Sequence, residues 1–124
     1  MSAGLVIGAG CSRGCPAAEL AELVEETLAG LEGTPIALAT IDSRAAEPCM
    51  VGVAARCGVA LHTHPAAALA AVEVPSPSAV VAVHVGTASV AEAAALLSAG
   101  PHGLLVVAKR RSAHATCAVA QEHA

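Results

Sequence analysis

Short apolar runs alternate with amphipathic or alanine-rich stretches along this chain, a pattern typical of alternating strands and helices. The run Gly-Leu-Val-Ile-Gly at residues 4–8 predicts a buried strand that leads into a Gly/Cys loop. After Pro16, leucines and Val24 recur at helical spacing, and four glutamates lie mostly on the other face. We therefore expect an amphipathic helix that ends at Gly30 or Gly33.

The same alternation continues to the end of the sequence. In order, it predicts a strand at 35–41, a polar loop at 42–44, a helix from Pro48 to Gly58, a strand at 59–63 and a helix from Pro65 to about Val72. Valines at 79–85 favour a strand, but the preceding Ser-Pro-Ser favours a helix start, and we expect a helix there. Ser89 to Glu92 form a capping box for a helix that Gly100-Pro101 ends. Strands at 104–109 and 115–120 follow, joined by a polar turn at 110–114.

These elements predict one α/β domain over residues 1–124, with three α/β/α layers and helices on both faces of the sheet. The sheet should be mixed and mostly parallel, with about five strands. The connection between the last two strands is too short for a crossover, so they should pair antiparallel.

Composition limits the core and the class of partner. The chain is 56% hydrophobic but has no aromatic residue, so small aliphatic side chains must fill the core. We expect either a modestly stable monomer or a homo-oligomer that buries more surface. A net charge of −4 argues against a nucleic-acid binder and against a polybasic membrane patch.

We expect no targeting signal in this sequence. It has no uninterrupted apolar stretch long enough to span a membrane, and its start lacks the basic region of a secretory signal. The five cysteines are an odd number, which favours reduced thiols. The expected location is the cytoplasm.

Basic residues gather at the predicted carboxyl ends of the strands, where open α/β sheets bind their ligands. Five of the six basic residues fall there: Arg13, Arg44, Lys109, Arg110 and Arg111. This distribution in an acidic protein favours an anionic ligand. The alternative is that loops carry charges because they are solvated.

The loop from Gly8 to Gly14 resembles a dinucleotide-binding turn but departs from it. Arg13 occupies the place of the last glycine of that fingerprint, and Gly14 comes one residue late. Free amides at the following helix start can still hold an anion, with Arg13 as a contact. A glycine-rich turn without a ligand is the competing interpretation.

Other polar residues give weaker signals. Cys11, near a helix start, could be a reactive thiol or pack as a small hydrophobe. His62 and His64 share a strand face but lack a third metal ligand, so we expect no metal. Asp42 and Glu47 could act as general acid and base, or serve only as a turn residue and a helix N-terminal charge.

Five segments, in this order, resemble the CobE / CbiG C-terminal domain family of cobalamin biosynthesis. They are Gly8-x-Gly10-Cys11-x-Arg13-Gly14-Cys15, Ala39-Thr40-Ile41-Asp42-x-Arg44-x-x-Glu47, Pro77-Ser78 through Val85-Gly86, Ser89-Val90-Ala91-Glu92-Ala93-Ala94, and Lys109 with Ala115-Thr116-Cys117-Ala118. The resemblance implies a three-layer α/β/α fold and a role in making the corrin ring. Longer CbiG proteins carry further N-terminal domains, and they are associated with opening a cobalt-precorrin lactone and releasing acetaldehyde.

On this resemblance, we expect a stand-alone CobE-type protein that binds an anionic corrinoid or precorrin intermediate and passes it between cobalamin-pathway enzymes, without a cofactor. The expected binding residues are Gly8, Gly10, Cys11, Arg13, Gly14, Thr40, Asp42, Arg44, Lys109 and Thr116. One alternative is a cobalt-precorrin-5A hydrolase or its subunit, with Asp42 or Glu47 activating water. A second alternative is a nucleotide-binding α/β domain.

Overall fold

A five-stranded sheet runs through the centre of the protein in the computed structural model, which describes residues 4–72 and 90–122. The strand order is β3-β2-β1-β5-β4. The strands are β1 (Gly4–Cys11), β2 (Thr34–Ile41), β3 (Ala60–His64), β4 (Leu104–Arg111) and β5 (Ala115–Gln121). The described helices are α1 (Ala17–Leu28), the short 3-10 helix η1 (Asp42–Arg44), α2 (Pro48–Cys57), α3 (Ala66–Ala70) and α5 (Val90–Ala99).

The sheet is mixed because β5 runs against its two neighbours. β1 pairs parallel with β2, and β2 pairs parallel with β3. β5 pairs antiparallel with both β1 and β4, so β4 points the same way as β1. The carboxyl ends of these four strands therefore share one edge of the sheet with the start of β5. The predicted α/β fold with an antiparallel last pair is confirmed.

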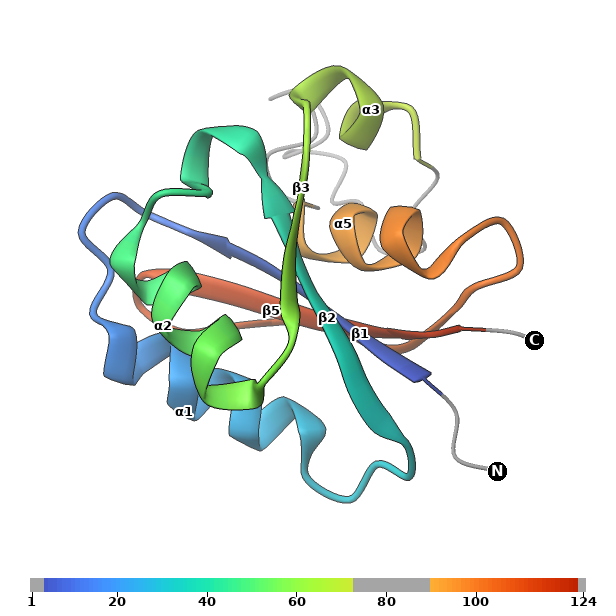
Figure 1. The fold of residues 1–124 in the computed structure, drawn as a ribbon, viewed down its shortest axis with the longest axis horizontal. Coiled ribbons are helices and arrows are strands. Elements are labelled where there is room, and N and C mark those ends of the chain that lie inside the picture. Colours follow the sequence, from blue (N-terminus) through green and yellow to red (C-terminus); the bar gives the residue numbers. More distant parts are fainter. Residues whose placement is uncertain (1–3, 73–89, 123–124) are drawn as a thin grey trace.

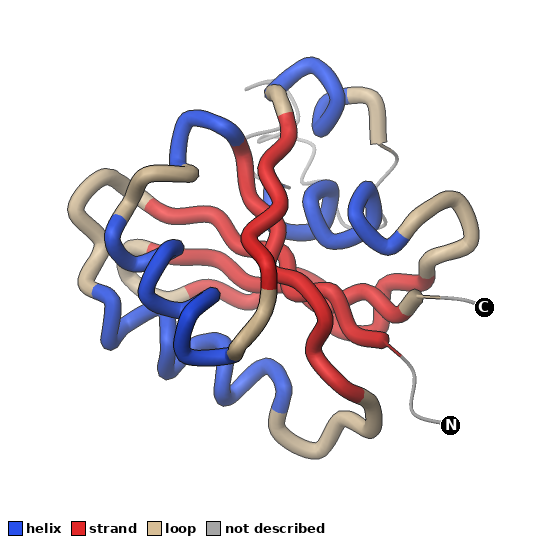
Figure 2. The backbone as a smooth tube through the Cα atoms, viewed as in Figure 1, coloured by secondary structure: helices blue, strands red, loops and turns tan. Residues whose placement is uncertain are grey.

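Helices cover both faces of the sheet (Figures 1 and 2). α1 and α2 pack on one face around a cluster that includes Ile7, Leu20 and Leu38. α5 packs on the other face, where its alanines meet Val6 and Ala39. Small residues let α5 come very close: a Cβ at Gly8 would lie 1.9 Å from the carbonyl oxygen of Ala91. The core is thus built from aliphatic residues, as the composition requires.

Pro48 and Gly58 bound α2 as expected. The helix begins at Pro48 and ends at Cys57, and Gly58 after it takes the left-handed conformation with φ of 69°. α1 starts one residue after Pro16 and ends at Leu28, two residues before Gly30. The expected helix at 79–85 and the cap at Ser89 lie outside the described residues.

Two strands are longer than the sequence pattern predicts. The Gly/Cys loop was expected after Gly8, but β1 continues to Cys11, which pairs with Ala115 of β5. The polar turn was expected to start at Arg110, but β4 continues to Arg111, which pairs with Thr116. Both predictions were wrong for the same reason: β5 supplies backbone partners that override the local preference of glycine and charged residues for loops.

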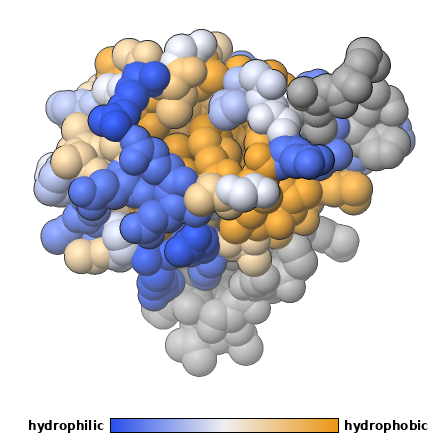
Figure 3. All heavy atoms as spheres, turned by 90° about the horizontal axis from the view of Figure 1, so that it is seen from below, coloured by the Kyte–Doolittle hydropathy of each residue, from blue (hydrophilic) through white to orange (hydrophobic). Residues whose placement is uncertain are grey.

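Some apolar side chains remain on the surface. Ile36 is 41% exposed, Leu104 57% and Val106 39%. Seen from below the view of Figure 1, a hydrophobic area lies beside a group of polar side chains (Figure 3). None of the described helices is both long and apolar enough to cross a bilayer.

Candidate functional site

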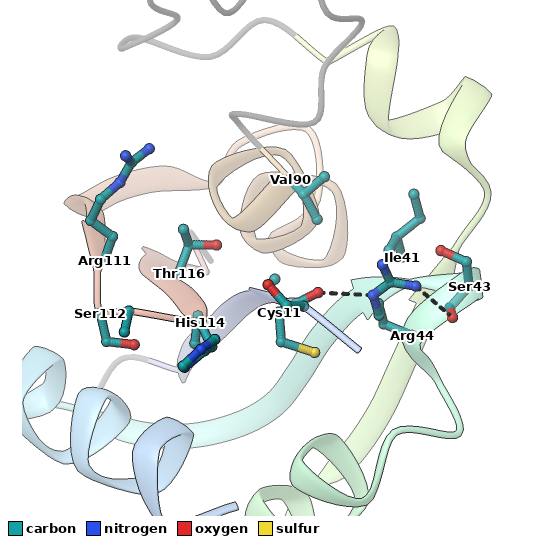
Figure 4. Close-up of a pocket in the computed structure, with 13 residues that line it drawn as sticks. Cys11, Ile41, Ser43, Arg44, Val90, Arg111, Ser112, His114 and Thr116 are labelled. Carbon is teal, nitrogen blue, oxygen red and sulfur yellow. Dashed lines mark hydrogen bonds between the residues drawn. The ribbon is translucent and has the colours of Figure 1, made fainter. Parts of the chain in front are cut away.

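A pocket of about 350 Å³ opens at the carboxyl edge of the sheet, between the ends of β1, β2 and the β4–β5 hairpin (Figure 4). We call it the sheet-edge pocket. Its walls are Gly10, Cys11, Ser12, Ile41, Ser43, Arg44, Val90, Arg111, Ser112, Ala113, His114, Ala115 and Thr116. These described lining residues include two arginines and no carboxylate. The pocket is therefore suited to a ligand with negative charge.

Arg44 forms one side of the sheet-edge pocket and is held there by the backbone. Its Nε–H donates to the carbonyl oxygen of Cys11 at 2.8 Å, and Nη1 donates to the carbonyl oxygen of Ser43 at 3.4 Å. The short helix η1 places Arg44 directly after β2, beside the end of β1. Because these contacts fix the guanidinium before a ligand arrives, binding costs it little conformational freedom.

The opposite side of the pocket is the β4–β5 hairpin, which α1 holds in place. Oε2 of Glu19 accepts the backbone N–H of His114 at 2.6 Å and the hydroxyl of Ser112. Its other oxygen lies 2.8 Å from Nδ1 of His114. The hydrogen bonds from Ser112 and His114 lower the pKa of Glu19 from 4.5 to about 2. Glu19 is thus ionised at neutral pH and anchors the hairpin.

Gly10 keeps the interior of the pocket open. A Cβ at this position would lie 2.8 Å from Oγ1 of Thr116 and 3.6 Å from Val90. Thr116 sits across from Gly10 in the β1–β5 pairing. Four of the predicted binding residues therefore line the sheet-edge pocket: Gly10, Cys11, Arg44 and Thr116.

Other predicted binding residues do not line the pocket but hold together the segments that form the edge of the sheet. Gly8 lies beneath α5, and the buried Thr40 hydroxyl donates to the carbonyl oxygen of Ala9 at 2.8 Å. This bond extends the contact between β1 and β2 beyond their last backbone pair, Gly8 with Ala39. Gly14, with φ of 74°, donates its N–H to the carboxylate of Glu47 at 2.9 Å.

Three predicted residues lie near the same edge but outside the walls of the pocket. Arg13 and Asp42 are exposed. Lys109 is half-buried on β4, and its backbone N–H donates to the buried carboxylate of Glu92 at 3.2 Å. None of the three is among the residues that line the sheet-edge pocket. Their binding roles remain predictions.

The hairpin residues Arg111, Ser112 and His114 line the pocket but were not among the expected binding residues. A usable signal was the alternation of side chains along a strand. Arg110 points to the α1 face, where Nη1 donates to the carbonyl oxygen of Glu26 at 3.1 Å. Arg111, one residue later, points to the opposite face and lines the pocket. The length of β4 had to be known before this alternation could be applied.

The histidines of β3 lie apart from the pocket. Nε2 of His64 is 2.6 Å from the hydroxyl of Ser98 on α5. Burial, followed by the nearby His62, lowers the pKa of His64. Among the described residues, the group that could hold a metal is instead Cys11, Glu47 and Cys49.

Two curated proteins are similar to this chain. CobE of Sinorhizobium sp is 42% identical over 123 residues, which is 95% of this chain and 80% of that protein. Cobalt-precorrin-5A hydrolase of Priestia megaterium is 34% identical over 119 residues, which is 94% of this chain but 32% of the hydrolase. The chain thus spans about a third of the length of that hydrolase.

Solved structures share the fold. A crystal structure of CobE, described as a protein from the cobalamin (vitamin B12) biosynthetic pathway, superposes with a TM-score of 0.83 at 37% identity and covers 98% of this chain and 92% of that one. The cobalamin biosynthesis protein chiG from Agrobacterium tumefaciens has a TM-score of 0.75 at 25% identity, covering 97% and 99%. The model of the family "Cobalamin synthesis G C-terminus" matches residues 5–120, so this chain belongs to that family of cobalamin biosynthesis proteins.

Proposed function

We propose that this protein binds an anionic corrinoid intermediate of cobalamin biosynthesis at the sheet-edge pocket and passes it to other enzymes of the pathway. The observation that carries the proposal is the pair of arginines, Arg44 and Arg111, which lie on opposite sides of a pocket whose described walls include no carboxylate. Corrin intermediates carry several acetate and propionate arms. Arginine is the side chain best suited to hold such carboxylates, because it donates two parallel hydrogen bonds.

The size of the pocket determines how the ligand would sit. About 350 Å³ can take the carboxylate arms but is too small for a whole macrocycle. The ring would therefore lie over the mouth of the pocket, against the apolar side chains of Ile41 and Val90. Aliphatic contacts must serve here because the chain has no aromatic side chain to stack on the ring.

The test is an absorbance titration with cobyrinic acid, which has free carboxylates, and with its heptamethyl ester as the neutral control. We expect the acid to bind and the ester to bind much more weakly. Arg44→Ala and Arg111→Ala should each weaken binding of the acid by about tenfold, the equivalent of one charge-assisted contact. Arg56→Ala is the matched control, because Arg56 of α2 pairs with Glu25 of α1 on the surface and does not line the pocket. Equal binding of acid and ester, or unchanged binding in both pocket variants, would contradict the proposal.

The similarity to the Priestia megaterium hydrolase favours a second candidate, hydrolysis of a cobalt-precorrin lactone. In that case the protein would release acetaldehyde from the lactone-bearing intermediate, and Glu47→Gln would abolish the release. Asp42 and Glu47 lie outside the walls of the pocket, so binding is the first proposal. Acetaldehyde release would contradict a role limited to binding and support the hydrolase function. Displacement of cobyrinic acid by a nucleotide would contradict both proposals and support a nucleotide-binding domain.

A further inference from the structure

Two thiols and a carboxylate converge beside the sheet-edge pocket, where β1 ends and α2 begins. The ligand atoms of Cys11, Glu47 and Cys49 all lie within 4.8 Å of one another. The Cys49 thiol donates to the sulfur of Cys11, and the two sulfur atoms are 3.6 Å apart. Cys11 and Cys49 are separated by 38 residues, so only the fold brings them together.

The fold fixes each member of this group, which we call the thiol triad. Cys11 is held by its pairing with Ala115 of β5. Cys49 is fully buried in the first turn of α2. The Gly14 N–H donates to one oxygen of Glu47 and so orients the carboxylate. Metal ligands in proteins are commonly oriented by a hydrogen bond of this kind.

The separation of the two sulfur atoms matches a shared metal ion. In a tetrahedral zinc site with Zn–S bonds of about 2.3 Å, two cysteine sulfurs lie about 3.8 Å apart. The observed 3.6 Å is close to that value. A disulfide would require the sulfurs to approach to about 2.05 Å.

We propose that Cys11, Glu47 and Cys49 bind a divalent cation that prefers thiolate ligands, such as Zn²⁺ or Co²⁺, with water in the fourth position. Binding forms two metal–sulfur bonds and one metal–oxygen bond. The Cys11 and Cys49 thiols each lose a proton to solvent, so two protons are released for each ion and no oxidant or reductant is needed. In Figure 4 the Cys11 sulfur points away from Val90 and Thr116, so the metal site and the sheet-edge pocket share Cys11 but occupy different sides of it.

The test is a titration of the reduced, chelator-treated protein with Co²⁺ alone, without any corrinoid. A thiolate-to-cobalt charge-transfer band should grow and saturate at one equivalent, in a near-ultraviolet region free of aromatic absorption. Zn²⁺ should bleach it by competition, and a pH indicator should record about two protons released per ion. A thiol assay in denaturant should first find all five cysteines free.

Variants assign the ligands. Cys11→Ser, Cys49→Ser and Glu47→Gln should each weaken Co²⁺ binding by about 100-fold or more. The amide oxygen introduced by Glu47→Gln can still accept the Gly14 N–H, so this variant should keep the loop in place. It therefore tests the proposal even if Cys49→Ser disturbs the core. Cys57→Ser is the matched control, because Cys57 lies at the far end of α2. This variant should bind Co²⁺ with the same affinity as the parent protein. Absence of the band, or the same affinity in Cys49→Ser and Glu47→Gln as in the parent, would overturn the proposal whether or not the protein binds a corrinoid.

Discussion

Gly8 lies directly beneath α5, and the absence of a side chain there lets the helix pack close to the sheet. A Cβ at Gly8 would lie 1.9 Å from the backbone oxygen of Ala91 and 2.8 Å from Ala95. Neither atom belongs to a flexible side chain, so the helix itself would have to move. The sequence showed only a glycine beside an apolar run; the helix above it comes from a segment more than 80 residues away.

Replacement of Gly8 with alanine should therefore lower the free energy of unfolding by about 1–3 kcal/mol, the usual cost of overpacking. Chemical denaturation followed by circular dichroism measures it. Gly52→Ala is the control, because the nearest atom to its new Cβ is 3.9 Å away and the site is inside helix α2. That variant should raise the free energy of unfolding by about 0.5–1 kcal/mol. If both variants changed stability in the same direction, the close approach of α5 would not be the cause.

At the scale of the elements, α1 and the β4–β5 hairpin are joined through the carboxylate of Glu19. This carboxylate holds His114 and Ser112, two residues of the sheet-edge pocket. The pKa of Glu19 is about 2 in the folded protein and 4.5 without these partners. Since the folded-state pKa is the lower one, the stabilisation is complete above pH 4.5 and is lost as the pH falls toward 2.

The Glu19→Gln variant should lack this part of the pH dependence. Denaturation at about pH 6 and about pH 3 should show a smaller loss of stability on acidification in the variant than in the parent. Glu22→Gln is the control, since Glu22 lies on the same helix and should leave the acid-induced loss unchanged. The same loss in parent and Glu19→Gln would contradict this role of Glu19.

The order of the described strands and α-helices followed from local patterns, but two strand ends did not, and residues 42–44 form the 3-10 helix η1 where a polar loop was expected. Leucine spacing predicts α1, and Pro48 with Gly58 marks α2, because these signals act within a few residues. The extensions of β1 to Cys11 and of β4 to Arg111 depend on pairing with β5. Pairing between distant segments leaves no trace in the local sequence, so these ends could not be predicted.

At the scale of the whole molecule, the sequence located the edge that carries the pocket but only part of its lining. Arg44 was predicted because parallel strands end together, whereas Thr116 was expected only from the family resemblance. Arg111 was missed as a binding residue because its direction depends on the length of β4. The thiol triad was missed because nothing in the local sequence relates Cys49 to Cys11.

The distribution of charge predicts how the proposed corrinoid binding responds to salt. The protein carries a net charge of −4, so attraction to an anion depends on the local field of Arg44 and Arg111. Raising the ionic strength from about 0.01 M to about 0.15 M shortens the screening length from about 30 Å to about 8 Å. Affinity for cobyrinic acid should fall over this range, while weak binding of the neutral ester should stay constant. An affinity for the acid that salt does not change would show that the arginines do not supply the attraction.

The position of β5 between β1 and β4 has a consequence for synthesis on the ribosome. β5 follows every other described strand in the chain, yet it fills the gap between β1 and β4 and contributes the start of the pocket-forming hairpin. A nascent chain that has emerged only as far as Arg111 can pair β1 with β2 and β2 with β3, but β4 has nothing to join. The sheet therefore closes after translation has passed Gln121, and shorter intermediates expose the edge of β1 to chaperones.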